Sequence, residues 1–510
     1  MDRQQWGTRA GFILAAVGSA VGLGNIWRFP YVAYENGGGA FLIPYLFALL
    51  TAGIPILIME FTMGHKYRGS APLTFFRLGG KKSEWIGWWG LSVAFIISTY
   101  YAVIIAWSMR YTIFSFNQAW GEDPEAFLFS EFLKLDVAPG ETGGMVWGIL
   151  IPLIIVWGLA LGILFKGVKK GIEMANRIFI PTLVVLFLII VVRAVTLPGA
   201  ATGLNAFFEP NFDLITDPTI WVAAYGHIFF SLSIAFAIMI TYSSYLSKKS
   251  DITNNAFITG FANSGFELLA GIGVFAALGF MATQMNVPVA DVADAGVGLA
   301  FAVFPQIINQ FPGMNGLFGV LFFLSLTLAG LSSLISITET YVAGISEKFG
   351  TSRSKAVVFG GGLAAIISTL FATQGGLFFL DAVDYFINQF GVAALGLVEV
   401  IMVIWILRKA DGLRSHANLT SDIKLGGWWK FCLVFITPIV LGYMMFGLLK
   451  QNILQEFATD TGNYEGYTTT FVLFGGVAVA GAALILGILL SLTKWNKKHA
   501  SFNEEDKKVG

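Results

Sequence analysis

The chain has 510 residues, of which 56% are hydrophobic and 12% charged, and its formal net charge is zero. Soluble domains carry about 25% charged residues, so the composition excludes an ordinary soluble protein and predicts an integral membrane protein. The net charge of zero says nothing about a partner. The single cysteine (Cys432) excludes an internal disulfide, and neither a nucleic-acid motif nor an obligatory protein partner is evident.

Twelve apolar segments are predicted to cross the ~30 Å hydrocarbon core of a lipid bilayer. Their approximate spans are 10–34, 38–64, 85–116, 146–165, 174–196, 219–246, 253–282, 315–347, 355–373, 378–408, 428–449 and 468–492. Most Lys and Arg residues lie near the termini or in every second connection, so the positive-inside rule places both termini in the cytoplasm. We expect an all-α, multi-pass protein of the cell membrane, with one transmembrane domain over 1–492 and a charged cytoplasmic tail over 493–510.

The first segment is interrupted at its middle by Gly18, Gly22 and Gly24, with Asn25 beside them. Glycine costs a helix roughly 1 kcal/mol relative to alanine, so this stretch predicts a helix that unwinds at mid-membrane. One half-helix would offer free N–H groups, which suit a carboxylate, and the other free carbonyls, which suit a cation. The glycine spacing alone fits equally well with a smooth face for close helix packing.

The sixth segment, YGHIFFSLSIAFAIMITY, has small and polar residues at its centre: Ser231, Ser233 and Ala235. Two interrupted helices in corresponding positions indicate a transporter site between them. We predict two five-helix repeats, over about 10–196 and 219–408, the second inverted because five crossings is an odd number. Segments 428–449 and 468–492 lie outside the repeat, and 288–312 is expected to form a short external helical hairpin.

Two stretches resemble a known family. VGLGNIWRFPY (21–31) followed by ENGGGAF (35–41) resembles the first-helix signature of the neurotransmitter:sodium symporters, and AGLSS (329–333) fits their eighth helix. The resemblance extends, more loosely, over about the first 410 residues. It implies the LeuT-type fold and a prokaryotic, sodium-coupled secondary active symporter that imports an amino acid by alternating access.

The resemblance implies two sodium sites built from carbonyl, amide and hydroxyl oxygens, the ligands that a hard cation prefers. Sodium site 1 would combine a substrate carboxylate oxygen with Ala20, Asn25, Ser231 and Asn263. Sodium site 2 would use Gly18, Val21, Ala329, Ser332 and Ser333. Without the resemblance, the two serines are better explained as hydroxyls that bond back to a carbonyl of their own helix.

A substrate site between the two unwound regions is also implied. N–H groups near Leu23 and Gly24 would receive a carboxylate with the help of Tyr101, and carbonyls of both breaks would receive an amine. The predicted substrate-binding residues are Ser19, Ala20, Leu23, Gly24, Ile97, Tyr101, Phe230, Ser231, Ser233, Phe236, Ser333 and Ile337.

Two positions bear on the substrate class. Family members that carry monoamines have an aspartate at position 22, whereas Gly22 indicates a substrate with its own carboxylate, an amino acid. Ala235 stands where members that accept bulky side chains often have glycine, which predicts a small neutral substrate such as glycine or alanine. One methyl group is worth only ~1–3 kcal/mol of discrimination, so larger neutral amino acids stay an alternative.

Gates are implied on both sides of the site. On the outer side Arg28 would pair with Asp384, above an aromatic lid of Tyr101 and Phe230. The predicted cytoplasmic gate consists of Arg3, Glu347 and Tyr245. Position 347 is aspartate in most family members. The simple alternative for each charge is solvation at a helix end.

Glu60, Glu267 and His227 lie within apolar segments, where a charge costs ~2.5–3.5 kcal/mol, so a role is the default expectation for such groups. Glu60 matches a family glutamate that supports packing of the first helix. Glu267 follows Asn263 by one turn, where chloride-dependent members have serine, and it is predicted to supply the negative charge that makes chloride unnecessary. His227 is either a neutral, hydrogen-bonded histidine or a partner of Glu267 in proton exchange.

Three rival functions are considered. A proton-coupled amino-acid carrier on the same architecture would need no sodium, and a channel would show no saturable uptake. A membrane enzyme using His227 and Glu267 lacks any nucleophile motif or metal-ligand spacing, so no enzymatic activity is predicted.

Overall fold

The computed structural model describes residues 4–294, 296–454 and 466–496. Within these ranges, ten helices are long and apolar enough to cross a membrane, and α1 (Arg9–Ala20) with Leu23–Glu35 forms a further span that bends by 56°. The sixth predicted segment is divided between two shorter helices, α12 (Pro218–Ser231) and α13 (Ile238–Ser243). Helices therefore form at all twelve predicted positions.

The other spans lie close to their predicted limits. Segments two to five are α4 (Leu42–Ala48) with α5 (Ile54–Tyr67), α7 (Lys81–Phe114), α9 (Trp147–Phe165) and α10 (Met174–Val195). Segments seven to twelve are α14 (Ile252–Met285), α17 (Asn315–Phe349), α18 (Arg353–Ala356) with α19 (Gly362–Ser368), α20 (Gly376–Phe386) with α21 (Ala394–Val400), α23 (Gly427–Phe431) with α24 (Thr437–Leu454), and α25 (Thr469–Val472) with α26 (Ala478–Leu492). Where two helices share a span, a wider π-helical stretch joins them.

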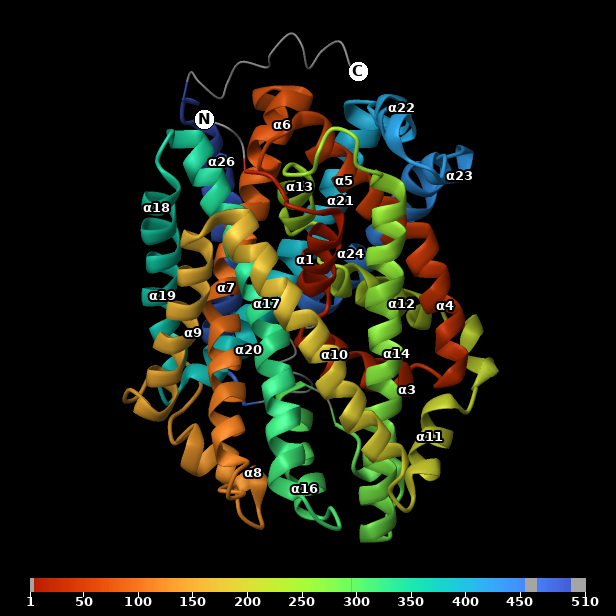
Figure 1. Cartoon of the computed structure of the whole chain (residues 1–510), viewed down its shortest axis with the longest axis vertical. Helices are drawn as coiled ribbons and strands as arrows, with labels where there is room; N and C mark the ends of the chain where they lie inside the picture. Colours follow the sequence, from red (N-terminus) through yellow and green to blue (C-terminus); the bar gives the residue numbers. More distant parts are fainter. Residues whose placement is uncertain (1–3, 295, 455–465, 497–510) are drawn as a thin grey trace.

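Shorter helices connect the spans at the two ends of the bundle (Figure 1). At one end lie α6 (Ala71–Gly79) and α22 (Ala410–Thr420), among the basic connections, so this is the predicted cytoplasmic end. At the opposite end lie α8 (Pro124–Ala126), α11 (Ala200–Phe208) and α16 (Phe304–Asn309). Helix α16 belongs to the expected external hairpin.

The break in the first span falls where the glycines predict it. Helix α1 ends at Ala20, α2 (Leu23–Trp27) begins after Gly22, and α3 (Phe29–Glu35) completes the span. Val21 and Gly22 have extended backbone between α1 and α2. The Gly22 N–H donates to Asn25 Oδ1 at 2.8 Å, so Asn25 closes the start of α2.

The break in the sixth span covers the six residues between α12 and α13, and three of them have left-handed backbone although none is glycine. These are Ser233 (φ 52°), Ala235 (φ 64°) and Ala237 (φ 63°). Each such conformation costs an L-residue roughly 1–2 kcal/mol. The unwinding also frees backbone groups, and the surrounding helices must satisfy them because no water is available in the bilayer core.

Glu60 of α5 satisfies one of these groups. The Ala235 N–H donates to Glu60 Oε1 at 2.7 Å, and the Glu60 side chain is fully buried. The sequence assigned Glu60 to packing of the first helix, which stays a prediction, and the structure adds that its carboxylate binds the N–H that unwinding of the sixth span exposes.

Candidate functional site

A cavity of about 570 Å³ lies between the two breaks. All twelve predicted substrate-binding residues line it, contributed by the first span, α7, the sixth span and α17. The lining continues past Arg28 and Asp384 to Val297 in the external hairpin and to Tyr467. The cavity therefore extends from the breaks toward the α16 end of the bundle.

One end of the cavity carries backbone N–H groups. The Leu23 N–H donates to the Tyr101 hydroxyl at 3.4 Å. A Cβ atom added to Gly22 would lie 3.1 Å from that hydroxyl and 3.2 Å from Ser333 Oγ. A side chain at position 22 would therefore meet Tyr101 and Ser333 directly, so this end suits a ligand that brings its own carboxylate.

The rest of the wall is largely apolar. Ile97, Phe230, Phe236 and Ile337 line the cavity as predicted, and Ile104 and Ile238 extend the apolar wall. Ala235 is not among the lining residues. The prediction that its methyl group trims the pocket was therefore wrong, because the left-handed turn at this residue and its bond to Glu60 hold it outside the wall.

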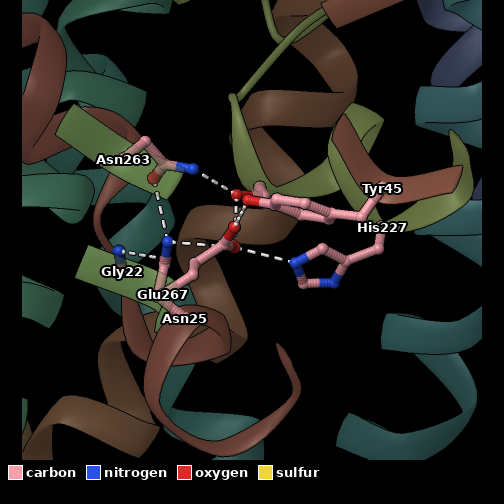
Figure 2. Close-up of polar contacts among 7 residues, drawn as sticks. Gly22, Asn25, Tyr45, His227, Asn263 and Glu267 are labelled. Atoms are coloured by element: carbon pink, nitrogen blue, oxygen red, sulfur yellow. Dashed lines mark hydrogen bonds and ion pairs between the residues drawn. The ribbon is translucent and has the colours of Figure 1, made fainter. Parts of the chain in front are cut away.

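The residues predicted for sodium site 1 meet beside the cavity (Figure 2). Asn25 Nδ2 donates to Asn263 Oδ1 at 2.8 Å, and Asn263 Nδ2 donates to Ser231 Oγ at 2.5 Å. Ala20, the fourth residue, lines the cavity at the end of α1. Two breaks and α14 thus bring amide, hydroxyl and carbonyl oxygens together, which is the donor chemistry that a sodium ion requires.

Glu267 lies at the centre of this cluster, between the Asn25 amide and the His227 ring (Figure 2). Its Oε1 accepts from Ser231 Oγ at 2.6 Å and Asn25 Nδ2 at 3.2 Å, and it lies 2.7 Å from His227 Nε2. The Tyr45 hydroxyl donates to Oε2. Glu267 is fully buried, so a charge on it would depend on these four neighbouring side chains.

The residues predicted for sodium site 2 meet where α17 contacts the end of α1. Ser332 Oγ donates to the Gly18 carbonyl at 2.7 Å and lies 2.8 Å from the Ala329 carbonyl, while Ser333 Oγ lies 3.4 Å from the Gly18 carbonyl. Val21 follows α1 at the break. Ser332 thus bonds back to its own helix and also reaches the first span, and Ser333 reaches the first span as well. A cation here would replace the hydroxyl protons as the partner of the carbonyls.

The predicted outer ion pair is not formed among the residues that the structure describes. The Arg28 guanidinium lies over the Phe230 ring, 4.8 Å from its centroid, and Asp384 accepts from Asn388 Nδ2 at 2.9 Å. Both charges line the cavity, and each has another partner. Among the described residues, the predicted ion pair of Arg28 with Asp384 is thus replaced by an arginine–aromatic contact and an amide hydrogen bond.

At the cytoplasmic end, Tyr245 binds an acid that the prediction did not include. Tyr245 donates to Glu339 Oε1 at 2.8 Å, and Arg353 binds both Glu339 oxygens at 2.8 and 2.6 Å. Glu347 instead accepts from the Ser70 N–H and hydroxyl at 2.9 and 2.6 Å, at the start of α6. Arg3 lies outside the described residues. The predicted pair of Arg3 with Glu347 therefore stays a prediction, and the structure adds the pair of Glu339 with Arg353 beside Tyr245, about two turns nearer the bilayer centre than Glu347.

Sequence reasoning missed Tyr45, Asn388, Glu339 and Arg353. Glu339 carried a usable signal, since an acid within an apolar span is expected to have a partner. Tyr45 and Asn388 carried none, because neutral polar side chains are ordinary in such helices.

Comparisons with known proteins match nearly the whole chain. The family model described as "Sodium:neurotransmitter symporter family" matches residues 3–124 and 121–497. An uncharacterized sodium-dependent transporter of Methanocaldococcus jannaschii is 44% identical over 97% of this chain and 98% of its own length. A sodium-dependent dopamine transporter of Caenorhabditis elegans is 29% identical over 95% and 86%, respectively. The crystal structure of MhsT in complex with L-phenylalanine superposes with a TM-score of 0.74 and 31% identity, over 87% of this chain and 99% of MhsT.

Proposed function

Because the chain belongs to the sodium:neurotransmitter symporter family, a family of membrane transporters and not enzymes, we propose that it imports a neutral amino acid by sodium-coupled alternating access. The observation that carries the proposal is the cavity between the two breaks. It joins the Leu23 N–H and the Tyr101 hydroxyl, an apolar wall and a cluster of sodium-type oxygen ligands in one space. Both termini would lie in the cytoplasm, at the α6 end.

We favour an amino acid with an apolar side chain larger than that of alanine. The size restriction expected from Ala235 is lost, since that residue stands outside the cavity wall. The apolar wall of Ile97, Phe230, Phe236 and Ile337 fits a branched or aromatic side chain. The ligand of MhsT, L-phenylalanine, supports the same size class. Glycine and alanine are the competing substrates in the test below.

Two sodium ions would drive the transport, one at each oxygen cluster. Each ion that moves down ~100 mV contributes roughly 2.3 kcal/mol, so two supply about 4.6 kcal/mol. This corresponds to about three decades of substrate accumulation before any chemical sodium gradient counts. Glu267 would take the place of a chloride ion, since its carboxylate accepts hydrogen bonds from residues of sodium site 1.

The test is uptake of labelled amino acids into proteoliposomes with imposed sodium gradients. We expect saturable, sodium-dependent uptake of L-phenylalanine or L-leucine at fixed pH, with weaker uptake of glycine and alanine. Uptake that persists without sodium and follows a pH gradient would identify a proton-coupled carrier instead. Preference for glycine or alanine would restore the small-substrate expectation and contradict the size class proposed here.

A matched pair of variants locates the sodium requirement. Ser332→Ala removes a hydroxyl that reaches the Gly18 carbonyl, whereas Ser325→Ala removes one that bonds only to Leu321 of the same helix, among the hydrogen bonds of the described residues. The first variant should raise the sodium concentration for half-maximal uptake and the second should not. Equal effects of both would argue against a sodium site at the end of α1.

A further inference from the structure

Glu173 ties the fifth span to the start of the first span. It ends the π-helical stretch η4 (Val168–Glu173), directly before α10, and its side chain is buried. Its Oε2 accepts from the Gly7 N–H at 2.6 Å, and its Oε1 accepts from the Thr8 hydroxyl at 3.0 Å. Arg177, one turn further along α10, donates to the same Oε1 at 2.8 Å. The carboxylate of one span thus holds the residues that precede α1 in another.

The contact with Glu173 is not what begins α1. Thr8 already caps this helix, since its hydroxyl oxygen accepts from the Gly11 N–H at 2.9 Å. The same oxygen accepts from Arg177 at 2.5 Å, and its proton goes to Glu173. A hydroxyl has one proton and two acceptor lone pairs, so Thr8 uses its full capacity here. Glu173 therefore adds a link between α1 and α10 to a helix start that is already capped.

Glycines of the first span make room for this link. A Cβ atom added to Gly11 would lie 2.3 Å from Glu173 Cδ. Seven residues further along α1, a Cβ atom added to Gly18 would lie 2.5 Å from Asn176 Oδ1. Distances below 3.0 Å are sterically excluded for a Cβ atom. Helices α1 and α10 can therefore lie this close only because both positions lack a side chain.

The cytoplasmic part of α1 lies between the cavity and the α6 end of the bundle. Among the described residues, α1 contributes only its last two residues, Ser19 and Ala20, to the cavity lining. Phe12 and Ala15 before them are fully buried. The Gly18 carbonyl of the predicted sodium site 2 belongs to the same helix. Movement of α1 away from α10 would therefore open the closed side and disturb that site.

We propose that Glu173 is the lock that keeps α1 against α10 and thereby keeps the cavity closed to the cytoplasm. The proposal rests on the proposed function, because only a transporter exposes one cavity to both sides of the membrane. A sodium ion bound to the Gly18 carbonyl would favour the same position of α1, since a ligand shifts the population toward the arrangement that it binds better. Glu173 and sodium therefore hold α1 from its two ends.

The experiment measures amide hydrogen exchange in the purified full-length protein, in sodium and in potassium buffer. In potassium, Glu173→Gln should speed exchange in α1 at least about tenfold, the factor for one lost hydrogen bond to a charged group, and leave α17 unchanged. Saturating sodium should reverse most of this increase. Gly11→Ala should act in the same direction, because its methyl group displaces the carboxylate, although alanine by itself favours a helix.

Two control variants match these changes. Asp251→Asn alters an acid that caps α14 near the end of α22, where it accepts from the Asn254 N–H at 3.0 Å, and asparagine is also a good cap residue. Gly162→Ala adds a methyl group to α9 at a position with no heavy atom of the described residues within 4 Å. Neither control should change exchange in α1.

Two outcomes would overturn the proposal. Faster exchange spread over all spans of Glu173→Gln, with a lower thermal unfolding temperature, would mean that Glu173 only supports the global fold. Unchanged exchange in α1 would mean that the carboxylate does not hold this helix. A parent whose α1 is not protected by sodium, while Glu173→Gln still speeds its exchange, would support the lock and contradict the sodium site at the end of α1, which separates this inference from the proposed function.

Discussion

Replacing Glu267 by serine should make the transporter dependent on chloride. In the structure the carboxylate receives donors from Asn25, Tyr45, His227 and Ser231. Glu267→Ser removes the charge and leaves these donors around an emptied space. A chloride ion can accept their hydrogen bonds and restore the negative charge, so sodium binding should recover when chloride is supplied.

The expected magnitude follows from the contact to Ser231. Ser231 Oγ, a proposed sodium ligand, lies 2.6 Å from Glu267 Oε1. Adding a cation–oxygen bond of roughly 2.4 Å places the carboxylate about 5 Å from the ion. At an effective dielectric constant of about 20, their attraction is about 3 kcal/mol, or a factor of about 100 in sodium affinity.

The assay is a sodium titration of substrate binding in gluconate and in chloride buffers. Glu267→Ser should need about 100-fold more sodium in gluconate and return toward the parent value in chloride, whereas the parent should be indifferent to the exchange. Glu267→Gln removes the charge but keeps the volume, so chloride should not rescue it. Sodium affinity of Glu267→Ser that equals the parent's in gluconate would refute the charge-balance reasoning.

Three further predictions concern the carboxylate end, sodium site 2 and the cytoplasmic closure. Gly22→Asp should abolish amino-acid binding, because the new carboxylate would lie beside Ser333 and repel the carboxylate of the substrate. Unchanged affinity in a binding assay would show that the substrate carboxylate does not bind at this end of the cavity. The double variant Ser332→Ala with Ser333→Ala should raise the sodium concentration for half-maximal binding at least about tenfold, since a loss of ~1.4 kcal/mol in binding free energy is a factor of ten in affinity. A sodium titration that matches the parent would show that the ion binds elsewhere. Arg353→Gln should lower the free energy of unfolding by about 3–5 kcal/mol, measured by thermal unfolding, because Glu339 is left buried and unpaired. Adding Glu339→Gln in the same chain should recover part of that loss. No recovery would show that the broken ion pair is not the cause.

The positions of the spans and of the first break were predictable because they depend on local properties of the chain. Runs of about twenty apolar residues specify helices that cross a bilayer. Gly22 and its neighbours weaken the first helix wherever the rest of the protein lies, and Asn25 supplies its own side chain to the new helix start. The structure shows the break at that point.

The position of the break in the sixth span was predictable from the sequence, but its backbone conformation was not. Small and polar residues mark its centre, yet Ser233, Ala235 and Ala237 adopt left-handed backbone that no local preference favours. Tertiary contacts impose it, since Glu60 and the Ser19 carbonyl receive the donors. For the same reason Ala235 lies outside the cavity wall, against the expectation from its sequence position.

By itself, the sequence determined which residues could serve at the site, because side chains with oxygen atoms beside helix-breaking residues can be identified from the linear sequence. Which of these residues meet was decided only by the tertiary structure. The rotation of each helix about its axis sets whether Tyr45 reaches Glu267, whether Arg353 reaches Glu339, and whether Arg28 faces Asp384 or Phe230. That rotation depends on packing along the whole bundle, so it cannot be predicted from the sequence of a single segment.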